Sequence, residues 1–374
     1  MKFRSLFLSA LCGLAVSTAF TSCSDDDGYD PYEYGSKVPL PEHRGLVLNE
    51  GTQGKNNASI SFFDAAKDTT TKTTNNLYFI QNKKNLGDTG QDLITYNSNI
   101  YVVVYGSNYI AKLNKAGIEQ NRYSFAENHG QPRYVVAYEG YLYVTTVGGY
   151  IVKLDANTLQ LDADCIIGKT PERIVEKDGI LYVAIGNTYD PVTPLIGDVI
   201  AIVDTRKFND SEVKKITVMA NTQLVAKCGN YIMVQGYGSI DYTHTPLWVY
   251  DIKSGKAEDT GEYASYVIEV NNGTEAFVVF SETDWDTWLT KNTFYIYNPT
   301  TKTKTDVTSK ITSAVSDLAS ATIYALCEGE NGSFYITTTL WSAGNGTVYH
   351  FDSNYNLLGS FTSWGQNPRK VVLM

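Results

Sequence analysis

The chain has 374 residues, a formal net charge of −10, and 43% hydrophobic residues. This length and apolar content are enough for one large core, and no apolar run after the N-terminal region is long enough to span a bilayer. The acidic balance argues against binding of nucleic acid and against electrostatic docking on anionic lipid.

Residues 1–22 have the pattern of a secretory signal peptide, with a basic start, an apolar run over 6–20 and small residues before Cys23. The placement of Cys23 resembles a bacterial lipobox, which predicts that this cysteine is acylated. The alternative is a buried cysteine after an ordinary cleavage site. Acyl chains contribute about 0.8 kcal/mol per buried methylene and would anchor the chain in a membrane.

The acidic run 24–27 follows Cys23 directly and resembles the surface-export signal of Bacteroidetes lipoproteins. A solvated acidic tether is the alternative. We therefore expect a lipid anchor in the outer membrane with the protein facing the cell exterior. Residues 23–44 contain no strand or helix pattern and are expected to form a lipidated acidic linker, which leaves 45–374 for the folded domain.

A short apolar strand that ends on Asp or Asn occurs seven times along this domain. The closing residues are spaced by about 41 to 54 positions, close to the period of about 40–50 that is typical of propeller blades. The seven strands are 59–64, 109–114, 150–155, 199–204, 247–251, 294–298 and 348–352.

A pair of β-rich segments joined by a tight turn precedes most of these strands, and a more polar strand such as 121–125 follows. Asp178-Gly179 between two β-branched runs is a strong hairpin signal. Helical periodicity is absent except for a possible short helix over 311–320. The expected hairpins are 91–106, 131–146, 170–185, 222–238, 265–282 and 321–340.

The two ends of the domain complement each other. The C-terminal segment 365–374 repeats the opening of the blade at 130–136 and then stops, whereas 45–51 looks like a second strand without a first. Pairing of these two strands would remove the free edges of an open array. The sequence thus predicts an all-β fold: a seven-bladed β-propeller with four-stranded blades, closed by the C-terminal strand. An open solenoid is the alternative.

In a propeller, the loops between second and third strands share a face with the loops between blades. On this face the loops are long and rich in aromatic and polar residues, whereas the opposite turns are short. Exposed Trp and Tyr suit a large, flat, amphipathic ligand. The predicted ligand-binding residues are Tyr189, Tyr237, Tyr242, His244, Trp285, Trp288, Trp341, Trp364, Arg133, Arg173, Arg369 and Gln131.

Some of these residues have a second interpretation. Arg133, Arg173 and Arg369 begin inner strands, where a ligand contact and a structural bond to a neighbouring blade are equally consistent with the sequence. Most strand tyrosines are expected to pack between blades. Calcium is possible at four loop carboxylates without dense acidic spacing, so it is the less favoured interpretation. They are Asp190, Asp241, Asp284 and Asp286.

Signals of catalysis are weak. Of the four histidines, only His129 and His244 fall on the candidate face. The chain contains no Gly-x-Ser-x-Gly elbow, metal-binding His pair or phosphate loop. Because propellers also host enzymes, a lactonase-like or metal-assisted hydrolase stays an alternative, but binding without turnover is the simpler interpretation. We expect no catalytic residues, no bound metal and no cofactor.

The segments 46–51 and 56–64 carry a resemblance to a known family. They resemble the YncE-like surface lipoproteins of Bacteroidetes, often labelled surface-layer proteins, over almost the whole domain. That family includes BtuG-type lipoproteins, and the resemblance implies a seven-bladed propeller that captures cobalamin or another corrinoid. It also implies delivery to a TonB-dependent outer-membrane transporter as partner. A siderophore or a glycan is the alternative ligand, and a purely structural envelope role is a further alternative.

Overall fold

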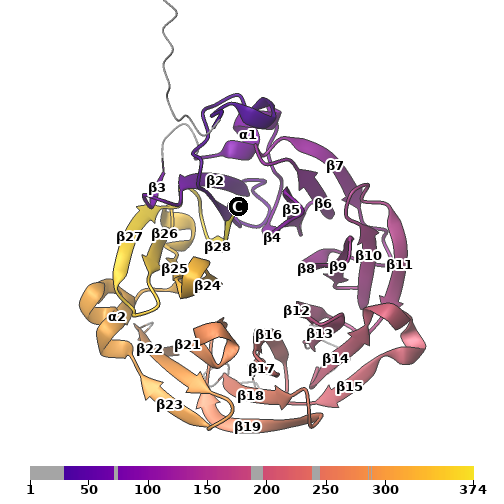
Figure 1. Ribbon diagram of the computed structural model, residues 1–374, viewed down its shortest axis with the longest axis vertical. Coiled ribbons are helices and arrows are strands. Elements are labelled where there is room, and N and C mark those ends of the chain that lie inside the picture. The colour runs from indigo at the N-terminus through magenta and orange to yellow at the C-terminus, as the bar shows by residue number, and fades with distance from the viewer. Residues whose placement is uncertain (1–28, 71–74, 187–196, 238–244, 285, 288) are drawn as a thin grey trace, which may run out of the picture. The chain divides into compact units, whose positions relative to one another are not determined.

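Seven antiparallel sheets of four strands follow one another around a central axis, and the first strand of each sheet lies innermost (Figure 1). The computed structural model describes residues 29–374 except 71–74, 187–196, 238–244, 285 and 288. The blades belong to the compact unit Pro31–Met374. This arrangement confirms the predicted seven-bladed propeller with four-stranded blades.

Each blade is numbered from its inner to its outer strand, and only blade 1 draws its inner strand from the end of the chain. The strands are β28 (Pro368–Leu373), β1 (Arg44–Asn49), β2 (Ser59–Asp64) and β3 (Thr69–Thr70) in blade 1; β4 (Gly90–Tyr96), β5 (Asn99–Val104), β6 (Tyr109–Leu113) and β7 (Glu119–Ser124) in blade 2; β8 (Pro132–Tyr138), β9 (Tyr141–Thr146), β10 (Tyr150–Asp155) and β11 (Leu161–Ile166) in blade 3; β12 (Pro171–Lys177), β13 (Ile180–Ile185), β14 (Val199–Asp204) and β15 (Lys214–Thr217) in blade 4; β16 (Thr222–Cys228), β17 (Tyr231–Gly236), β18 (Pro246–Asp251) and β19 (Lys256–Tyr263) in blade 5; β20 (Tyr266–Val270), β21 (Glu275–Asp284), β22 (Leu289–Asn298) and β23 (Thr303–Asp306) in blade 6; and β24 (Ile323–Glu328), β25 (Phe334–Thr338), β26 (Thr347–Phe351) and β27 (Leu357–Thr362) in blade 7.

The helical elements are short. The predicted helix over 311–320 appears as a slightly earlier α-helix followed by a 3-10 turn, and the helix α1 was not predicted because six residues show too little periodicity. None of the described helices is long and apolar enough to cross a membrane. The helices are α1 (Leu77–Asn82), α2 (Thr308–Ala314), η1 (Glu33–Gly35), η2 (Thr205–Lys207), η3 (Asp210–Glu212), η4 (Asn271–Gly273), η5 (Ser316–Ala319), η6 (Glu330–Gly332) and η7 (Trp341–Ala343).

The ring closes as the ends of the domain predicted. β28 pairs antiparallel with β1, with Val371 opposite Val47, and both residues are buried in a cluster with Phe63 and Tyr335. A backbone bond from Met374 N to the carbonyl oxygen of Arg44 (2.9 Å) extends the pairing. The closure leaves no free inner edge between the first and last blades.

The predicted strand tyrosines pack between neighbouring blades. Tyr101, Tyr143, Tyr182 and Tyr335 are each buried in an apolar cluster that includes residues of the next blade. The Tyr101 hydroxyl also donates to the carbonyl oxygen of Ala156 in blade 3 (2.6 Å), which satisfies its polar atom inside the core.

The repeated closing residue of the third strand caps the turn to the fourth strand in all seven blades. Its side-chain oxygen accepts a backbone N–H two residues later, as in Asp155 with Asn157 (2.9 Å) and Asn298 with Thr300 (3.0 Å). Asx turns of this kind favour Asp and Asn, which explains the repeat. The other five are Asp64, Asn114, Asp204, Asp251 and Asp352.

These caps predict acid sensitivity. Hydrogen bonds from Thr158 and Asn157 lower the pKa of Asp155 below 3.8, so its folded-state stabilisation is present above that value and is lost as pH falls through the depressed pKa. We expect the melting temperature of wild type to fall more steeply between pH 5 and pH 3 than that of Asp155→Asn, whose amide oxygen accepts at any pH. Asp155→Ala should cost about 1 kcal/mol at pH 7. Equal slopes for wild type and Asp155→Asn would contradict the capping role.

The segment before β1 packs on the blades. Leu40 is buried, the Lys37 N–H donates to the Gln81 side-chain oxygen on α1 (3.0 Å), and Arg44 pairs with Glu33. Residues from Pro31 onward therefore belong to the same compact unit as the propeller.

Candidate functional site

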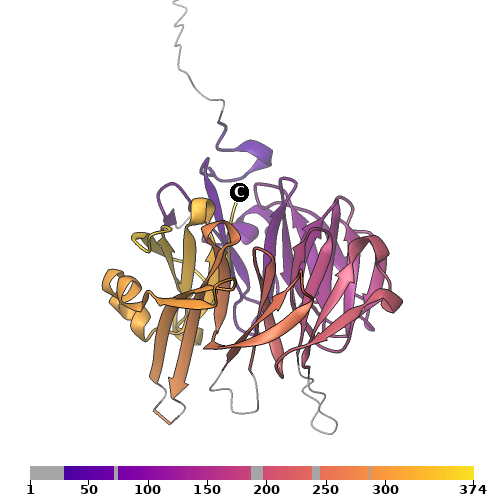
Figure 2. The same cartoon turned by 60° about the horizontal axis from the view of Figure 1, so that its bottom comes forward.

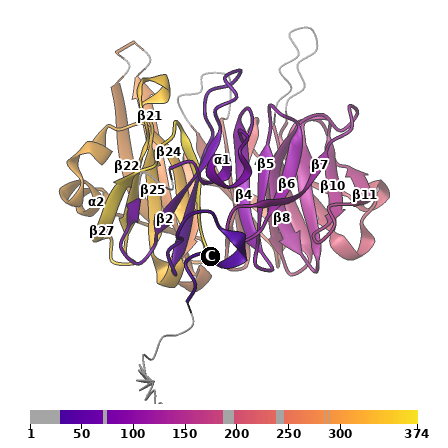
Figure 3. The ribbon, with the colours of Figure 1, turned by 90° about the horizontal axis from the view of Figure 1, so that it is seen from above.

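The first residues of the inner strands surround a cavity of about 500 Å³ at the centre of the ring. Inner strands all run in the same direction, so their starts meet at one face. Figure 3 places the end of β28, marked as the C-terminus, on the face opposite to the tip of the long β21–β22 hairpin, and Figure 2 shows the same division from a tilted view. The cavity thus opens on the face that carries the loops between second and third strands.

A β-bulge at the start of the inner strand explains which side chains reach the cavity. In blade 3 the register shifts between Pro132 and Val135, so two residues oppose one on β9. Arg133 and Tyr134 occupy this bulge, and both line the cavity. A bulge interrupts the alternation of side chains along a strand and re-aims them. Blades 1, 2, 4, 5 and 7 show a register shift at the corresponding position.

Arg369 ties several blades together at one side of the cavity. Its guanidinium donates to Glu50 (2.5 Å), to the Gln91 carbonyl oxygen (2.9 Å) and to the Tyr134 hydroxyl (2.9 Å). Tyr324 donates to the same Glu50 carboxylate (2.5 Å). Burial disfavours the charged guanidinium, but Tyr134 and Glu50 outweigh this effect and raise the pKa of Arg369 well above its ordinary value. Arg369 therefore stays charged and links blades 1, 2 and 3.

Arg133 and Glu172 form a second pair across the boundary between blades 3 and 4. The Arg133 Nε lies 3.1 Å from a Glu172 carboxylate oxygen, and a second guanidinium nitrogen contacts the same oxygen. Burial raises the pKa of Glu172, and the Arg133 charge opposes that rise. The structural bond that the sequence left open is therefore present for Arg133 and Arg369, and contact with a ligand stays a prediction for both.

Arg173 and Lys370 differ from these two cations. Both line the cavity, and neither side chain forms a hydrogen bond or an ion pair with any residue that the structure describes. Their charges both act on the Cys327 thiol, whose pKa burial raises and these two cations lower in part. Because Arg173 lies on β12 and Cys327 on β24, on the far side of the ring, this effect indicates that the Arg173 charge extends into the opening.

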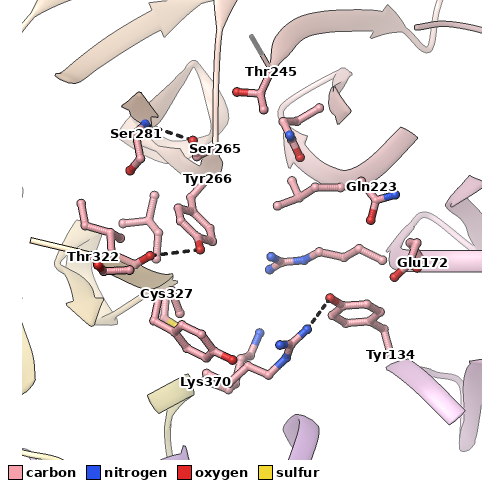
Figure 4. A pocket seen from close by; sticks show the side chains of 18 of the residues that line it. Tyr134, Glu172, Gln223, Thr245, Ser265, Tyr266, Ser281, Thr322, Cys327 and Lys370 are labelled. Atoms are coloured by element: carbon pink, nitrogen blue, oxygen red, sulfur yellow. Dashed lines mark hydrogen bonds between the residues drawn. The ribbon is translucent and has the colours of Figure 1, made fainter. Parts of the chain in front are cut away.

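Tyrosines and hydroxyl groups complete the wall. Figure 4 shows Tyr134, Glu172 and Gln223 facing Tyr266 and Cys327 across the opening. The Tyr266 hydroxyl donates to the Ile323 carbonyl oxygen (3.2 Å), and burial raises its pKa far above the ordinary value. The phenols stay protonated at physiological pH and serve as hydrogen-bond donors and apolar surface rather than as bases.

An exposed indole stands at the edge of this cavity. Trp341 on η7 is 55% exposed and lines the cavity, with its ring edge-on to Tyr324 at 5.8 Å between centroids. Its backbone N–H donates to Thr339 Oγ1 (2.8 Å), which in turn bonds to Asn367 (2.6 Å). Leu340 beside it is 62% exposed. The loop therefore holds an aromatic residue in solvent on a fixed backbone.

Five of the twelve predicted ligand-binding residues line the cavity: Arg133, Arg173, Arg369, Tyr237 and Trp341. Gln131 and Trp364 do not line it: Gln131 is exposed one residue before β8, and Trp364 is half-buried with a φ of 59°. Five others and the lipidation residue lie outside the described residues. They are Tyr189, Tyr242, His244, Trp285, Trp288 and Cys23.

The sequence analysis did not single out the neighbours of these residues. Tyr134, Glu172 and Lys370 stand beside the three arginines in the same Pro-initiated motif, at 132–134, 171–173 and 368–370. Comparison of these three motifs gives a signal for the pair of residues after the proline. Tyr266 and Tyr324 have no such motif and look like ordinary strand residues.

The possible metal and catalytic groups are placed as follows. Among the described residues, no group of three His, Cys, Asp or Glu side chains is placed to hold a metal ion; Asp190 and Asp241 lie outside this part of the chain. His129 is buried, and its Nε2 pairs with Asp164 on the outer strand of the same blade (2.9 Å). It does not line the cavity. Calcium binding and the absence of enzymatic activity stay predictions.

Comparison with known proteins gives similarity of structure only. No family model and no curated protein sequence matches the chain. A quinoprotein alcohol dehydrogenase-like protein from Bacteroides thetaiotaomicron has a TM-score of 0.58 at 14% identity over 87% of this chain and 77% of its own. Apo AztD from Citrobacter koseri has 0.51 at 10% over 89% and 98%. Virginiamycin B lyase from Staphylococcus aureus has 0.52 at 11% over 73% and 83%. At these identities the similarity shows the propeller fold and leaves ligand and reaction open.

Proposed function

We propose that this protein is a binding lipoprotein that captures a bulky amphipathic nutrient, best represented by cobalamin or another corrinoid. The observation that carries the proposal is the exposed Trp341 on a fixed backbone at the edge of a polar central cavity. A rigid indole adds contact area at low entropic cost, and the polar wall offers hydrogen bonds to amides. No catalytic group is required for this role.

The cellular setting is part of the same proposal. An acylated Cys23 would hold the propeller at the outer membrane, facing the exterior, and the acidic segment after it would act as a tether. A TonB-dependent transporter would then receive the ligand. Support for this setting comes from the N-terminal sequence and from the family resemblance.

Titration of the purified protein with cobalamin tests the proposal. We expect binding heat and a change in the corrinoid spectrum at micromolar protein, and we expect Trp341→Ala to weaken binding by about tenfold because a central aromatic contact is worth about 1–3 kcal/mol. Leu358→Ala on β27 is the matched control, since Leu358 is also 55% exposed but lies on an outer strand. It should bind like wild type.

A wild-type protein that gives no heat and no spectral change would reject a corrinoid. Equal affinity of wild type and Trp341→Ala would reject the role of this face in corrinoid binding. A ferric siderophore is the second candidate, because the cavity wall carries more cationic than acidic side chains and many iron chelates are anionic. The same titration with a ferric chelate would separate the two.

A further inference from the structure

The cavity contains uncompensated positive charge although the whole chain is acidic. Four cations and two carboxylates line it among the described residues. Arg133 is neutralised by Glu172 and Arg369 by Glu50, while the second lining carboxylate, Asp92, accepts backbone N–H groups of Leu93 (2.9 Å) and Val135 (3.0 Å). The two remaining cations are Arg173 and Lys370.

These two cations come from different sides of the ring. Lys370 lies on β28 of blade 1 and Arg173 on β12 of blade 4, yet both charges act on the same Cys327 thiol. The pair therefore encloses one region of the cavity rather than two separate surface spots. A partly enclosed site strengthens the attraction between these charges and an anion.

Two buried polar groups line the same cavity without a partner. Gln91 is 2% exposed and Thr245 is 6% exposed, and neither the Gln91 Nε2 nor the Thr245 Oγ1 finds a hydrogen-bond partner among the described residues. A buried donor without a partner costs about 1–3 kcal/mol. Such groups are common where a polar ligand supplies the missing bond.

We infer that the central cavity is a binding site for an oxyanion group, a carboxylate or a phosphate, held between Arg173 and Lys370 with Gln91 and Thr245 as further donors. Guanidinium and ammonium groups bind these anions through charge-assisted hydrogen bonds. At about 500 Å³ the cavity fits a small acid or an anionic substituent of a larger ligand. This site goes beyond the proposed function and does not depend on what covers the cavity.

Calorimetric titration with inorganic phosphate and, separately, with citrate tests this site. Both are added at constant low ionic strength, since salt screens such contacts. We expect wild type to bind at least one of them, and Arg173→Gln and Lys370→Gln each to lose about tenfold or more in affinity. Arg173→Lys should retain part of the binding. Arg173 forms no hydrogen bond with the described residues, so its replacement should leave the melting temperature unchanged.

The matched control is Lys227→Gln, which removes the same charge from an exposed position near the other end of inner strand β16 and should bind like wild type. Absence of anion binding by wild type, or equal loss in Lys227→Gln, would overturn the inference. Phosphate binding without citrate binding assigns the site to phosphate, and the reverse assigns it to carboxylates. The titration contains no corrinoid, so its failure leaves the proposed function untouched, and failure of the corrinoid titration leaves this site untouched.

Discussion

Deletion of residues 368–374, which removes β28, should abolish the folded propeller. β28 supplies the inner strand of blade 1, and its loss exposes the fully buried Leu46, Val47 and Leu48 on β1 together with the backbone groups that β28 pairs with. Each fully buried aliphatic side chain contributes about 1.5–3 kcal/mol. The combined loss approaches the total stability of a typical protein, about 5–15 kcal/mol.

Circular dichroism and thermal melting would measure this effect. The deleted protein should be insoluble or should lack a cooperative transition, whereas removal of Met374 alone should lower the melting temperature only slightly, because Met374 lies after the strand and contributes one backbone bond. A shortened protein that melts cooperatively near the wild-type temperature would show that the ring does not depend on this closure.

Arg369→Met should lower the free energy of unfolding by about 3 kcal/mol. The substitution leaves the Glu50 carboxylate with Tyr324 as its printed side-chain donor and removes the bonds to Gln91 and Tyr134. Loss of one partner of a buried ion pair costs about 3–5 kcal/mol. We expect the lower end because the Arg369 and Glu50 side chains keep 24% and 19% of their exposure.

Urea unfolding of Arg369→Met, Glu50→Gln and the double variant would isolate the pair. The double variant should be less destabilised than the sum of the two single variants, because neither charge is then left alone. Arg369→Lys should keep the charge but lose part of the geometry, and should fall between wild type and Arg369→Met. A change below about 0.5 kcal/mol in Arg369→Met, the size of a neutral surface substitution, would contradict a structural role for this residue.

Features that repeat in every blade could be predicted from the sequence. The acidic or amide residue at the end of each third strand has one local cause, the capped turn after the strand. The complementary ends predicted the pairing of β28 with β1, because each half-blade lacks the strand that the other supplies. Periodic burial and turn chemistry depend on neighbouring residues, so a single sequence contains them.

The content of the cavity could be predicted only in part. Period-two alternation fails at the start of the inner strands, because a bulge turns both residues of pairs such as Arg133-Tyr134 toward the cavity. Nothing local distinguishes Arg173, which has no partner in the described part of the chain, from Arg369, which forms three kinds of bond. That difference depends on Glu50 and Tyr134, which lie far from Arg369 in the sequence.

Hydrogen–deuterium exchange with and without saturating cobalamin tests most directly whether this face of the propeller binds the ligand. We predict slower exchange at η7 around Trp341 and at the inner-strand starts around Arg173 and Arg369, with no change at the opposite turns Glu139-Gly140 and Asp178-Gly179. Slower exchange confined to those turns, or no difference anywhere along the chain, would contradict binding at the central cavity.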